Sequence, residues 1–296
     1  MSGSPEVKYR GVALLKNEGH SVKKCCELLK VSYSGFYDCL NRKPSKRKEQ
    51  DDHLKAKILS IFGKSKETYG SPRIQKSLQR DGEKVGKDKV AKLMKEEGLR
   101  AKCKRTFRPK TTINNPSTMK SARVFKIEES QVTGPNQVWV SDLTYLPTGK
   151  GFSYLVTVMD IFNREIKGWD VSDSMEAGNT KKALLEAVKR ASGRLKGLVF
   201  HSDQGIQYCS SEVRNKLKIL KITQSMSRKG NCYDNAFAES FFGTMKNELD
   251  KNKFEDLNEV KREIFKYVNW YNRERLHSSL GYLSPMEYKT ENRLAA

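Results

Sequence analysis

The chain has 296 residues, of which 36% are hydrophobic and 31% charged, and its formal net charge is +22. This length suits about two domains, and no stretch approaches the roughly 20 apolar residues that cross a bilayer, which argues against an integral membrane protein. Six cysteines without CxxC spacing and four scattered histidines argue against a disulfide scaffold or a structural zinc site, so we expect a reducing, cytoplasmic compartment.

The positive charge is concentrated in the first part of the chain. Residues 1–120 hold 30 Lys and Arg against 13 Asp and Glu, whereas residues 121–296 hold 27 against 22. A basic first part joined to a nearly balanced second part favours a nucleic-acid-binding region attached to a working domain. A solvated surface is one alternative, and binding to an acidic membrane is another, although no amphipathic anchor is visible.

Residues 5–43 are predicted to form a module of three short helices. Apolar spacing marks the first helix, and Ser21 and Ser32 are placed to cap the second and third. The spacing of these helices is typical of a helix-turn-helix, with Tyr33 to Asn41 as the recognition helix. An unspecialised three-helix bundle fits the spacing equally well, and the basic charge is what favours DNA. Residues 42–48 are then interpreted as a basic linker.

Residues 50–110 are predicted to form a second helical DNA-binding module with a basic tail. Ser71 followed by Pro72 indicates an N-cap and a proline at the first helical position, and the last helix of the module ends near Gly98. The tail over 100–110 has six cations and no acid, which suits contact with phosphates but also fits a solvated tether. Residues 111–134 are interpreted as a linker.

Residues 135–250 are predicted to form a mixed α/β domain. Three strands rich in β-forming residues come first, with a turn over 147–151, and helices alternating with short strands follow. Such an order predicts a mixed sheet with helices on its faces. Residues 251–296 are expected to form a helical extension. The predicted strands lie at 137–146, 152–162, 165–171, 198–200 and 222–224, and the main helix of the extension at 257–275.

Two acids in this domain are predicted to end short apolar strands, and a third lies on a helix. Asp142 follows one strand, Asp203 follows another, and Glu239 comes 36 positions after Asp203. Carboxylates at the ends of adjacent strands suit magnesium, and phosphodiester chemistry benefits from two divalent ions. A single acid after a strand is more often a turn or cap residue. The combination of three acids with a basic first part is what favours a metal site.

The helix that carries Glu239 is predicted to have two faces. Phe237, Phe241 and Met245 recur at helical spacing and form the buried face, while Glu239 lies about 200° around the helix from Phe241. Glu239 is expected to share its side with Phe242 and Lys246. Lys246 is thereby placed to meet a phosphate.

Five stretches of the sequence resemble those of the DDE transposases of bacterial insertion sequences, of the OrfB type related to retroviral integrases. The resemblance covers almost the whole chain, and the 35 residues between Asp203 and Glu239, with a lysine seven residues later, make it specific. No His-His-Cys-Cys zinc module of the retroviral kind precedes the core. The five stretches are TYGSPRI (68–74), VWVSDLTY (138–145), HSDQG (201–205), GNCYDNA (230–236) followed by Glu239, and YNRERLH (271–277).

The resemblance implies an RNase H-like catalytic core and two Mg²⁺ or Mn²⁺ ions held by Asp142, Asp203 and Glu239. It implies cleavage at the ends of a mobile element, followed by attack of the freed 3′-OH on target DNA. The expected partners are the terminal inverted repeats, the target DNA and further copies of the chain on paired ends. In relatives of this kind an upstream reading frame often supplies a part that binds the element ends and contains a coiled coil. This sequence has no sustained leucine heptad, so we expect an upstream-frame product as a further partner. The expected location is the bacterial cytoplasm, at the nucleoid when DNA is bound.

The residues leave two other functions open. One is a DNA-binding regulator whose catalytic fold is idle, and the other is a general RNase H-like nuclease, which the tandem helical modules disfavour. His277 is interpreted as structural. The candidates for DNA contact are Lys246, Arg73, Lys104 and Arg105.

Overall fold

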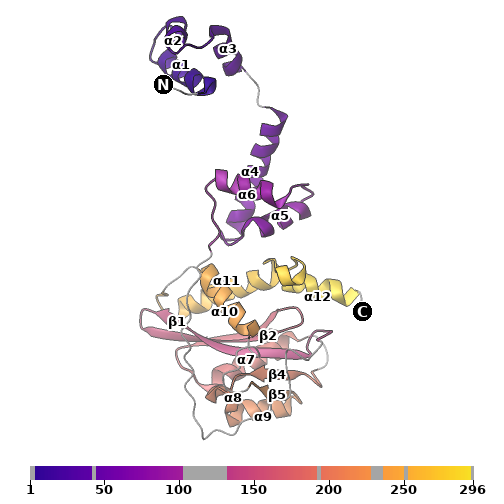
Figure 1. The fold of residues 1–296 in the computed structure, drawn as a ribbon. Helices are drawn as coiled ribbons and strands as arrows, with labels where there is room; N and C mark the ends of the chain where they lie inside the picture. Colours follow the sequence, from indigo (N-terminus) through magenta and orange to yellow (C-terminus); the bar gives the residue numbers. More distant parts are fainter. Residues whose placement is uncertain are drawn as a thin grey trace. The chain divides into compact units, whose positions relative to one another are not determined.

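The computed structural model describes residues 4–41, 45–102, 132–191, 195–227, 236–249 and 253–294. It divides into two compact units, Met1–Leu59 and Ser60–Ala296, whose elements are labelled in Figure 1. Within the described ranges, no helix is both long and apolar enough to cross a membrane.

The first unit contains three short helices, as predicted. They are α1 (Pro5–Asn17), α2 (Val22–Leu28) and α3 (Tyr33–Asn41), and they enclose a small core of Val12, Cys25, Cys26 and Phe36. Ser32 caps α3, since its hydroxyl oxygen accepts a hydrogen bond from the Gly35 amide at 3.2 Å. Ser21 occupies the N-cap position of α2 but makes no capping hydrogen bond through its side chain.

The fourth helix, α4 (Lys46–Lys64), carries the boundary between the two units. It begins at Lys46, inside the stretch that was interpreted as a basic linker, so that interpretation is wrong from Lys46 onward. Lysine and arginine have high intrinsic helix propensity, and a run of them extends a helix as readily as it forms a tether.

Two more helices follow in the second unit, α5 (Ser71–Arg80) and α6 (Lys87–Glu96), and they pack against each other. The predicted N-cap of α5 is wrong by one residue: Gly70 is the cap, and Ser71 is already helical with proline in the first turn. Gly82, just after the helix, has a positive φ of 84°, a left-handed conformation that commonly ends a helix. The buried residues of the pair are Ile74, Leu78, Val90, Leu93 and Met94.

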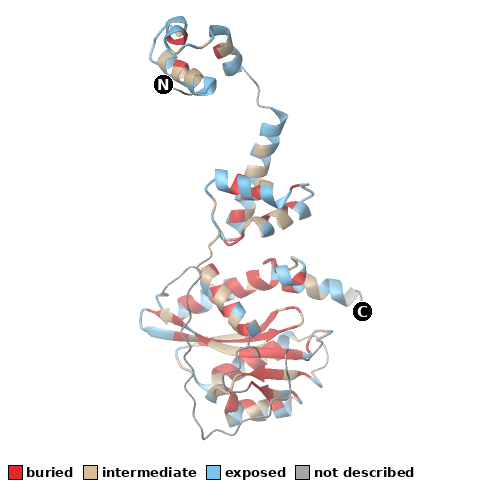
Figure 2. Ribbon diagram, viewed as in Figure 1, coloured by how far each residue is buried: buried red, intermediate tan, exposed pale blue. Residues whose placement is uncertain are grey.

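A five-stranded mixed sheet follows, in the order β3-β2-β1-β4-β5. The antiparallel part is β1 (Val138–Thr148), β2 (Gly151–Asp160) and β3 (Ile166–Ser172). The strands β4 (Val199–Ser202) and β5 (Thr223–Met226) then continue the sheet in parallel with β1. This confirms the predicted mixed α/β architecture, and Figure 2 shows that the central strands are the most deeply buried part of the unit.

The hairpin between β1 and β2 is tighter than predicted. Instead of a turn over 147–151, β1 runs to Thr148 and β2 starts at Gly151, which leaves Gly149 and Lys150 between the strands. The extension is held from outside the hairpin, because the Phe254 amide donates to the Pro147 carbonyl at 2.9 Å and Thr148 forms an isolated bridge with Phe254.

Helices cover both faces of the sheet (Figure 1). On one face lie α7 (Ala177–Arg190), α8 (Ile206–Cys209) and α9 (Ser211–Ile219), which close a core around Trp139, Val158 and Phe200. On the other face α10 (Ala236–Leu249) contacts β1, and α11 (Leu257–Arg273) contacts β3. A 3-10 turn, η2 (Ser278–Leu280), and a last helix, α12 (Pro285–Leu294), follow.

Gly168 on β3 fixes how closely α7 approaches the sheet. A Cβ at this position would overlap the Ala183 carbonyl oxygen and the Ala187 nitrogen, both in the backbone of α7. Only glycine allows the helix to lie so near the strand.

Candidate active site

The register of two parallel strands places Asp142 next to Asp203. β1 pairs with β4 from Val138↔Val199 to Ser141↔Ser202, and each acid is the residue that follows the last pair. The two carboxylates therefore start from neighbouring backbone positions at the same edge of the parallel pairing. This juxtaposition is the one that the strand pattern predicted.

The prediction that Asp142 ends its strand is wrong. β1 continues for six residues beyond it, because Asp142 pairs with Thr157 and the hairpin with β2 extends to Thr148. What ends after Ser141 is the pairing with the short strand β4, which stops at Ser202. Asp142 thus lies within a continuous strand, one residue beyond its pairing with β4, while Asp203 begins a loop.

Backbone amides orient both carboxylates. Oδ1 of Asp203 accepts a hydrogen bond from the Gly205 amide at 2.9 Å, and Oδ1 of Asp142 accepts one from the Leu143 amide at 2.9 Å. Burial raises the pKa of Asp203 above its ordinary value, against the opposing effect of the Gly205 hydrogen bond. A carboxylate whose charge is poorly solvated is stabilised by a nearby cation.

A buried tyrosine lies close to both acids. The Tyr208 hydroxyl is 3.0 Å from the Ser141 hydroxyl, and burial raises the pKa of Tyr208 well above its ordinary value. The negative charges of Asp142 and Asp203 raise the pKa of Tyr208 further. One phenol therefore lies within electrostatic range of both carboxylates. Sequence reasoning missed Tyr208, whose role depends on how α8 packs under β1.

Glu239 is the third predicted acid, and it lies in the first turn of α10. α10 contacts β1, and Asp142 points to the same side of the sheet, because alternate residues Trp139 and Leu143 face the opposite core. Among the residues that the structure describes, however, no three His, Cys, Asp or Glu side chains are grouped closely enough to hold a metal ion. The structure brings Asp142 and Asp203 together and leaves Glu239 outside that group.

The buried face of α10 differs in part from the prediction. Phe241 and Met245 are buried as expected, but Phe242, which was placed on the side of Glu239, is buried too at 5% exposure. It packs against Phe241, with ring centroids 5.5 Å apart. The helix is covered on two sides rather than one, since both the sheet and α11 contact it.

Lys246 lies in the last turn of α10, at the exposed surface. Its Nζ is 4.7 Å from the centre of the Tyr145 ring on β1, and Tyr145 packs edge-on against Phe152 at 5.4 Å. Tyr145 and Phe152 are both about half exposed. A lysine held over an exposed aromatic pair is a surface that suits a nucleic acid strand.

Of the other predicted DNA contacts, the structure describes only Arg73. Its Nε donates to the Leu276 carbonyl at 2.9 Å, and its guanidinium stacks on the Tyr69 ring at 5.6 Å. These bonds give Arg73 a structural role between α5 and the segment after α11. Lys104 and Arg105 lie outside the described residues.

The interpretation of His277 as structural is supported by its burial and by its backbone. Its amide donates to the Leu283 carbonyl at 3.1 Å, and its ring meets Tyr271 edge-on at 4.7 Å. Burial, together with the positive charges of Arg275, Arg73 and Arg164, lowers its pKa to about 2. The cluster of arginines around this ring was not predicted, since Arg164 lies over a hundred residues upstream.

Comparison with known proteins assigns most of the chain to described domains. A family model described as "Integrase core domain" matches residues 132–232, and a second with the same description matches 220–285. A model described as "HTH-like domain" matches residues 49–107.

Several curated proteins are similar over nearly their full length. The "Insertion element IS600 uncharacterized 31 kDa protein" of Shigella sonnei is 41% identical, over 89% of this chain and 97% of that protein. The "Transposase for insertion sequence element IS904" of Lactococcus lactis is 38% identical, over 86% and 100%. The "Transposase InsF for insertion sequence IS3A" of Escherichia coli is 36% identical, over 92% and 95%. Among solved structures, the HTLV-2 integrase catalytic core domain in complex with magnesium aligns with a TM-score of 0.44 at 19% identity, over 54% of this chain and 99% of that one.

Proposed function

This chain belongs to the DDE transposases of insertion sequences, within the integrase superfamily, and on that premise we propose that Asp142, Asp203 and Glu239 carry out its DNA chemistry. The protein is an enzyme that acts on DNA, with an α/β, RNase H-like core and an HTH-like domain. The proposal adds the residues and the steps: cleavage at the ends of the element, then transfer of the freed 3′-OH into target DNA.

The observation that carries the proposal is the position of Asp142 beside Asp203. Their strands end their pairing together, and both charges act on the Tyr208 hydroxyl. Two carboxylates at one sheet edge are the oxygen donors that Mg²⁺ and Mn²⁺ prefer, so the residues fit a divalent metal. The raised pKa of Asp203 also supports a metal ion, because burial disfavours the charged carboxylate and a bound cation would stabilise it.

We propose two ions, Mg²⁺ or Mn²⁺, held by Asp142 and Asp203 with Glu239 as the third ligand. When bound, such ions supply Lewis-acid stabilisation of the phosphodiester and activation of the attacking oxygen. Glu239 fits this role because it lies on a helix that contacts β1, on the side of the sheet to which Asp142 points. The Gly205 amide orients the Asp203 carboxylate, and the Leu143 amide orients the Asp142 carboxylate.

Lys246 is proposed to bind a backbone phosphate of the DNA, beside the exposed Tyr145 and Phe152 rings. Arg73, Lys104 and Arg105 remain candidates for DNA contact, and Arg73 already has the Leu276 carbonyl as a partner. The expected partners are the terminal inverted repeats, the target DNA and further copies of the chain on paired ends. An upstream-frame product is a further candidate partner, and the cytoplasm, at the nucleoid, is the proposed location.

The experiment that tests the proposal uses the purified chain and labelled duplexes from the flanks of its own coding region. With Mg²⁺ or Mn²⁺ the duplexes should be nicked at the element ends and joined to target DNA. Binding without nicking or joining would favour a DNA-binding regulator and contradict the proposal. Hydrolysis of RNA–DNA hybrids without joined products would favour a general nuclease instead.

A further inference from the structure

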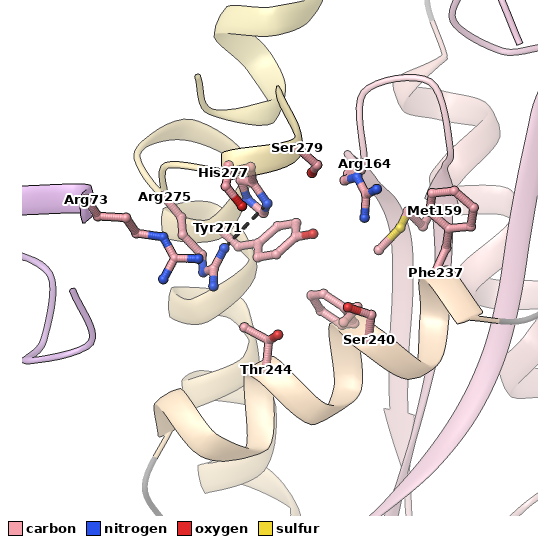
Figure 3. Close-up of a pocket in the computed structure, with 12 residues that line it drawn as sticks. Arg73, Met159, Arg164, Phe237, Ser240, Thr244, Tyr271, Arg275, His277 and Ser279 are labelled. Carbon is pink, nitrogen blue, oxygen red and sulfur yellow. Dashed lines mark hydrogen bonds between the residues drawn. The ribbon is translucent and has the colours of Figure 1, made fainter. Parts of the chain in front are cut away.

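A polar pocket of about 130 Å³ lies on the α10 side of the sheet, away from the paired aspartates of the proposed active site. Its walls come from α5, the turn between β2 and β3, α10, and the segment after α11. Figure 3 shows that the Arg164 guanidinium and the Tyr271 hydroxyl point toward the same space, with Ser240, Thr244 and Ser279 around it. The volume is several times the roughly 30 Å³ that one water takes in the liquid.

Three arginines line this pocket, and none of the other described residues that line it is an acid. Arg275 is neutralised by a buried ion pair with Glu248, with Nη2 2.6 Å from Oε1. In the part of the chain that the structure describes, neither Arg73 nor Arg164 makes a carboxylate ion pair. Burial lowers the pKa of Arg73, and the like charge of Arg275 lowers it further. Among the described residues that line it, the pocket therefore has cations and no acid, a combination that an anion would neutralise.

Backbone geometry holds Arg164 at the pocket. Its φ is +60°, in the left-handed region that non-glycine residues rarely adopt, within the turn from β2 to β3. Its guanidinium lies 4.8 Å from the centre of the Phe237 ring on α10. An uncommon backbone conformation that directs a cation into a cavity is the kind of feature found at functional sites.

His277 supplies a second, independent sign of a ligand. Its side chain lines the pocket, the residue is only 6% exposed, and its Nε2 has no hydrogen-bond partner among the described residues. Nδ1 lies 3.4 Å from Nη1 of Arg275, so in one tautomer of the neutral ring it accepts a hydrogen bond from that guanidinium. A buried ring nitrogen that lines a cavity without a side-chain partner is available to a ligand.

We propose that this pocket binds a phosphate group of the DNA backbone. Guanidinium groups, hydroxyls and a neutral imidazole N–H are together the donors that a tetrahedral oxyanion accepts. Ser240 directly follows Glu239 on α10, so a phosphate held here lies beside the proposed third catalytic acid. The assignment of this phosphate to DNA rests on the proposed function, whereas a free oxyanion such as inorganic phosphate shares the same chemistry.

Two substitutions test the pocket with matched controls. Ser279 is exposed at its edge, so Ser279→Asp adds a negative charge with little effect on folding, and Ser279→Asn is nearly the same size without the charge. Arg164→Gln removes a pocket cation, and Arg190→Gln removes an exposed cation at the end of α7. Each pair separates the pocket from general charge effects.

The first measurement is the unfolding temperature of the full chain in inorganic phosphate, compared with chloride at equal ionic strength. Phosphate should raise it by a few degrees for the wild type and Arg190→Gln and not for Arg164→Gln, and it should raise it less for Ser279→Asp than for Ser279→Asn. Equal responses of Ser279→Asp and Ser279→Asn would overturn the anion pocket.

The second measurement is binding of a labelled duplex, without divalent metal, over a range of salt concentrations. Ser279→Asp should bind at least about tenfold more weakly than Ser279→Asn, and its plot of log K against log salt should be shallower by about one. If phosphate binding is lost while duplex affinity and slope stay unchanged, the pocket takes a free anion and the DNA assignment fails. This assay measures binding and not cleavage, so its result tests the phosphate pocket even if the proposed cleavage chemistry is wrong.

Discussion

Arg275 and Glu248 form a buried ion pair that ties the segment after α11 to α10. Nε and Nη2 of the guanidinium both donate to the carboxylate, at 2.9 Å and 2.6 Å, and the Tyr267 hydroxyl donates to Oε2 at 2.8 Å. Burial disfavours the charge of Arg275, but the hydrogen bonds and attraction of Glu248 outweigh it and raise the arginine pKa. Arg275 therefore keeps its charge in the buried pair.

Glu248→Gln should destabilise the protein by about 3–5 kcal/mol, because it leaves the Arg275 charge buried without its counter-ion. The control is Glu186→Gln, which breaks an exposed pair with Lys189 at 3.0 Å and should change stability by less than about 0.5 kcal/mol. Urea unfolding of both variants measures the difference. A loss below about 1 kcal/mol for Glu248→Gln would show that the pair is not the anchor of α10.

Asp142→Asn and Asp203→Asn should each lower cleavage and strand transfer by more than about 100-fold, with duplex binding nearly unchanged. The reason is that losing a residue that only orients a metal ligand already costs about 10–100-fold, and these carboxylates are proposed as the ligands themselves. Glu239→Gln should do the same if it completes the site. Asp173→Asn, at an exposed acid just after β3, is the matched control and should keep its activity. Substantial cleavage by a purified Asp142→Asn or Asp203→Asn protein would refute the assignment.

Tyr208→Phe and Ser141→Ala should each destabilise the protein by about 1–2 kcal/mol, since each leaves a buried hydroxyl without its 3.0 Å partner. Removing both hydroxyls leaves neither unsatisfied, so the double variant should lose less than the sum of the two. The coupling in a double-mutant cycle, measured by urea unfolding, should be about 1 kcal/mol. Additive losses would mean that the two hydroxyls do not bond.

As the pH is lowered into the mildly acid range, the His277→Gln variant should lose less stability than the wild type. The pKa of His277 is lowered from 6.5 to about 2 by burial and by Arg275, Arg73 and Arg164, so only the unfolded chain takes up a proton between these values. The contribution of the neutral His277 to the free energy of unfolding is therefore fully present above about pH 6.5 and is lost as the pH falls below that value. Between pH 7 and 5.5 the wild type should lose about 1 kcal/mol more than the variant, at about 1.4 kcal/mol per pKa unit. Parallel urea-unfolding profiles would contradict a neutral buried imidazole.

Gly168→Ala should cost about 1–3 kcal/mol, because its new methyl meets the backbone of α7 and cannot be accommodated by a side-chain rotation. Gly178→Ala, near the start of α7, meets no atom within 4 Å and should stabilise by about 0.4–1 kcal/mol. Thermal unfolding distinguishes the opposite signs. A stable Gly168→Ala protein would mean that α7 can withdraw from β3 at little cost.

Local patterns in the sequence predicted the elements and the place of the acids. The alternation and the apolar runs predicted the order of strands and helices. The juxtaposition of Asp142 and Asp203 follows from the pairing of β1 with β4, which stops one residue before each acid. The three acids as catalytic ligands remain a prediction. The position of Asp142 within its strand was misjudged, because the length of β1 depends on β2 and Phe254 rather than on its own residues.

Ion pairs between residues of different elements could not be predicted from the sequence. Lys167 is fully buried and pairs with Glu165 at 3.1 Å, and Lys289 reaches the same carboxylate from α12 at 3.1 Å. A lysine at an inward strand position looks like an error in a hydrophobic pattern until its partner is known. The same holds for the arginines around His277, which come from different elements.

The contacts of Tyr69 and Arg73 with the segment after α11 also set an order of events during synthesis. The Tyr69 hydroxyl accepts from the Leu276 amide at 2.7 Å and Arg73 donates to the Leu276 carbonyl, although more than two hundred residues separate the partners. The helices α5 and α6 can form on the ribosome long before Leu276 is translated, because their own packing is local. Their attachment to the segment after α11 must wait until Leu276 has been translated, so this contact forms after the local packing of α5 on α6.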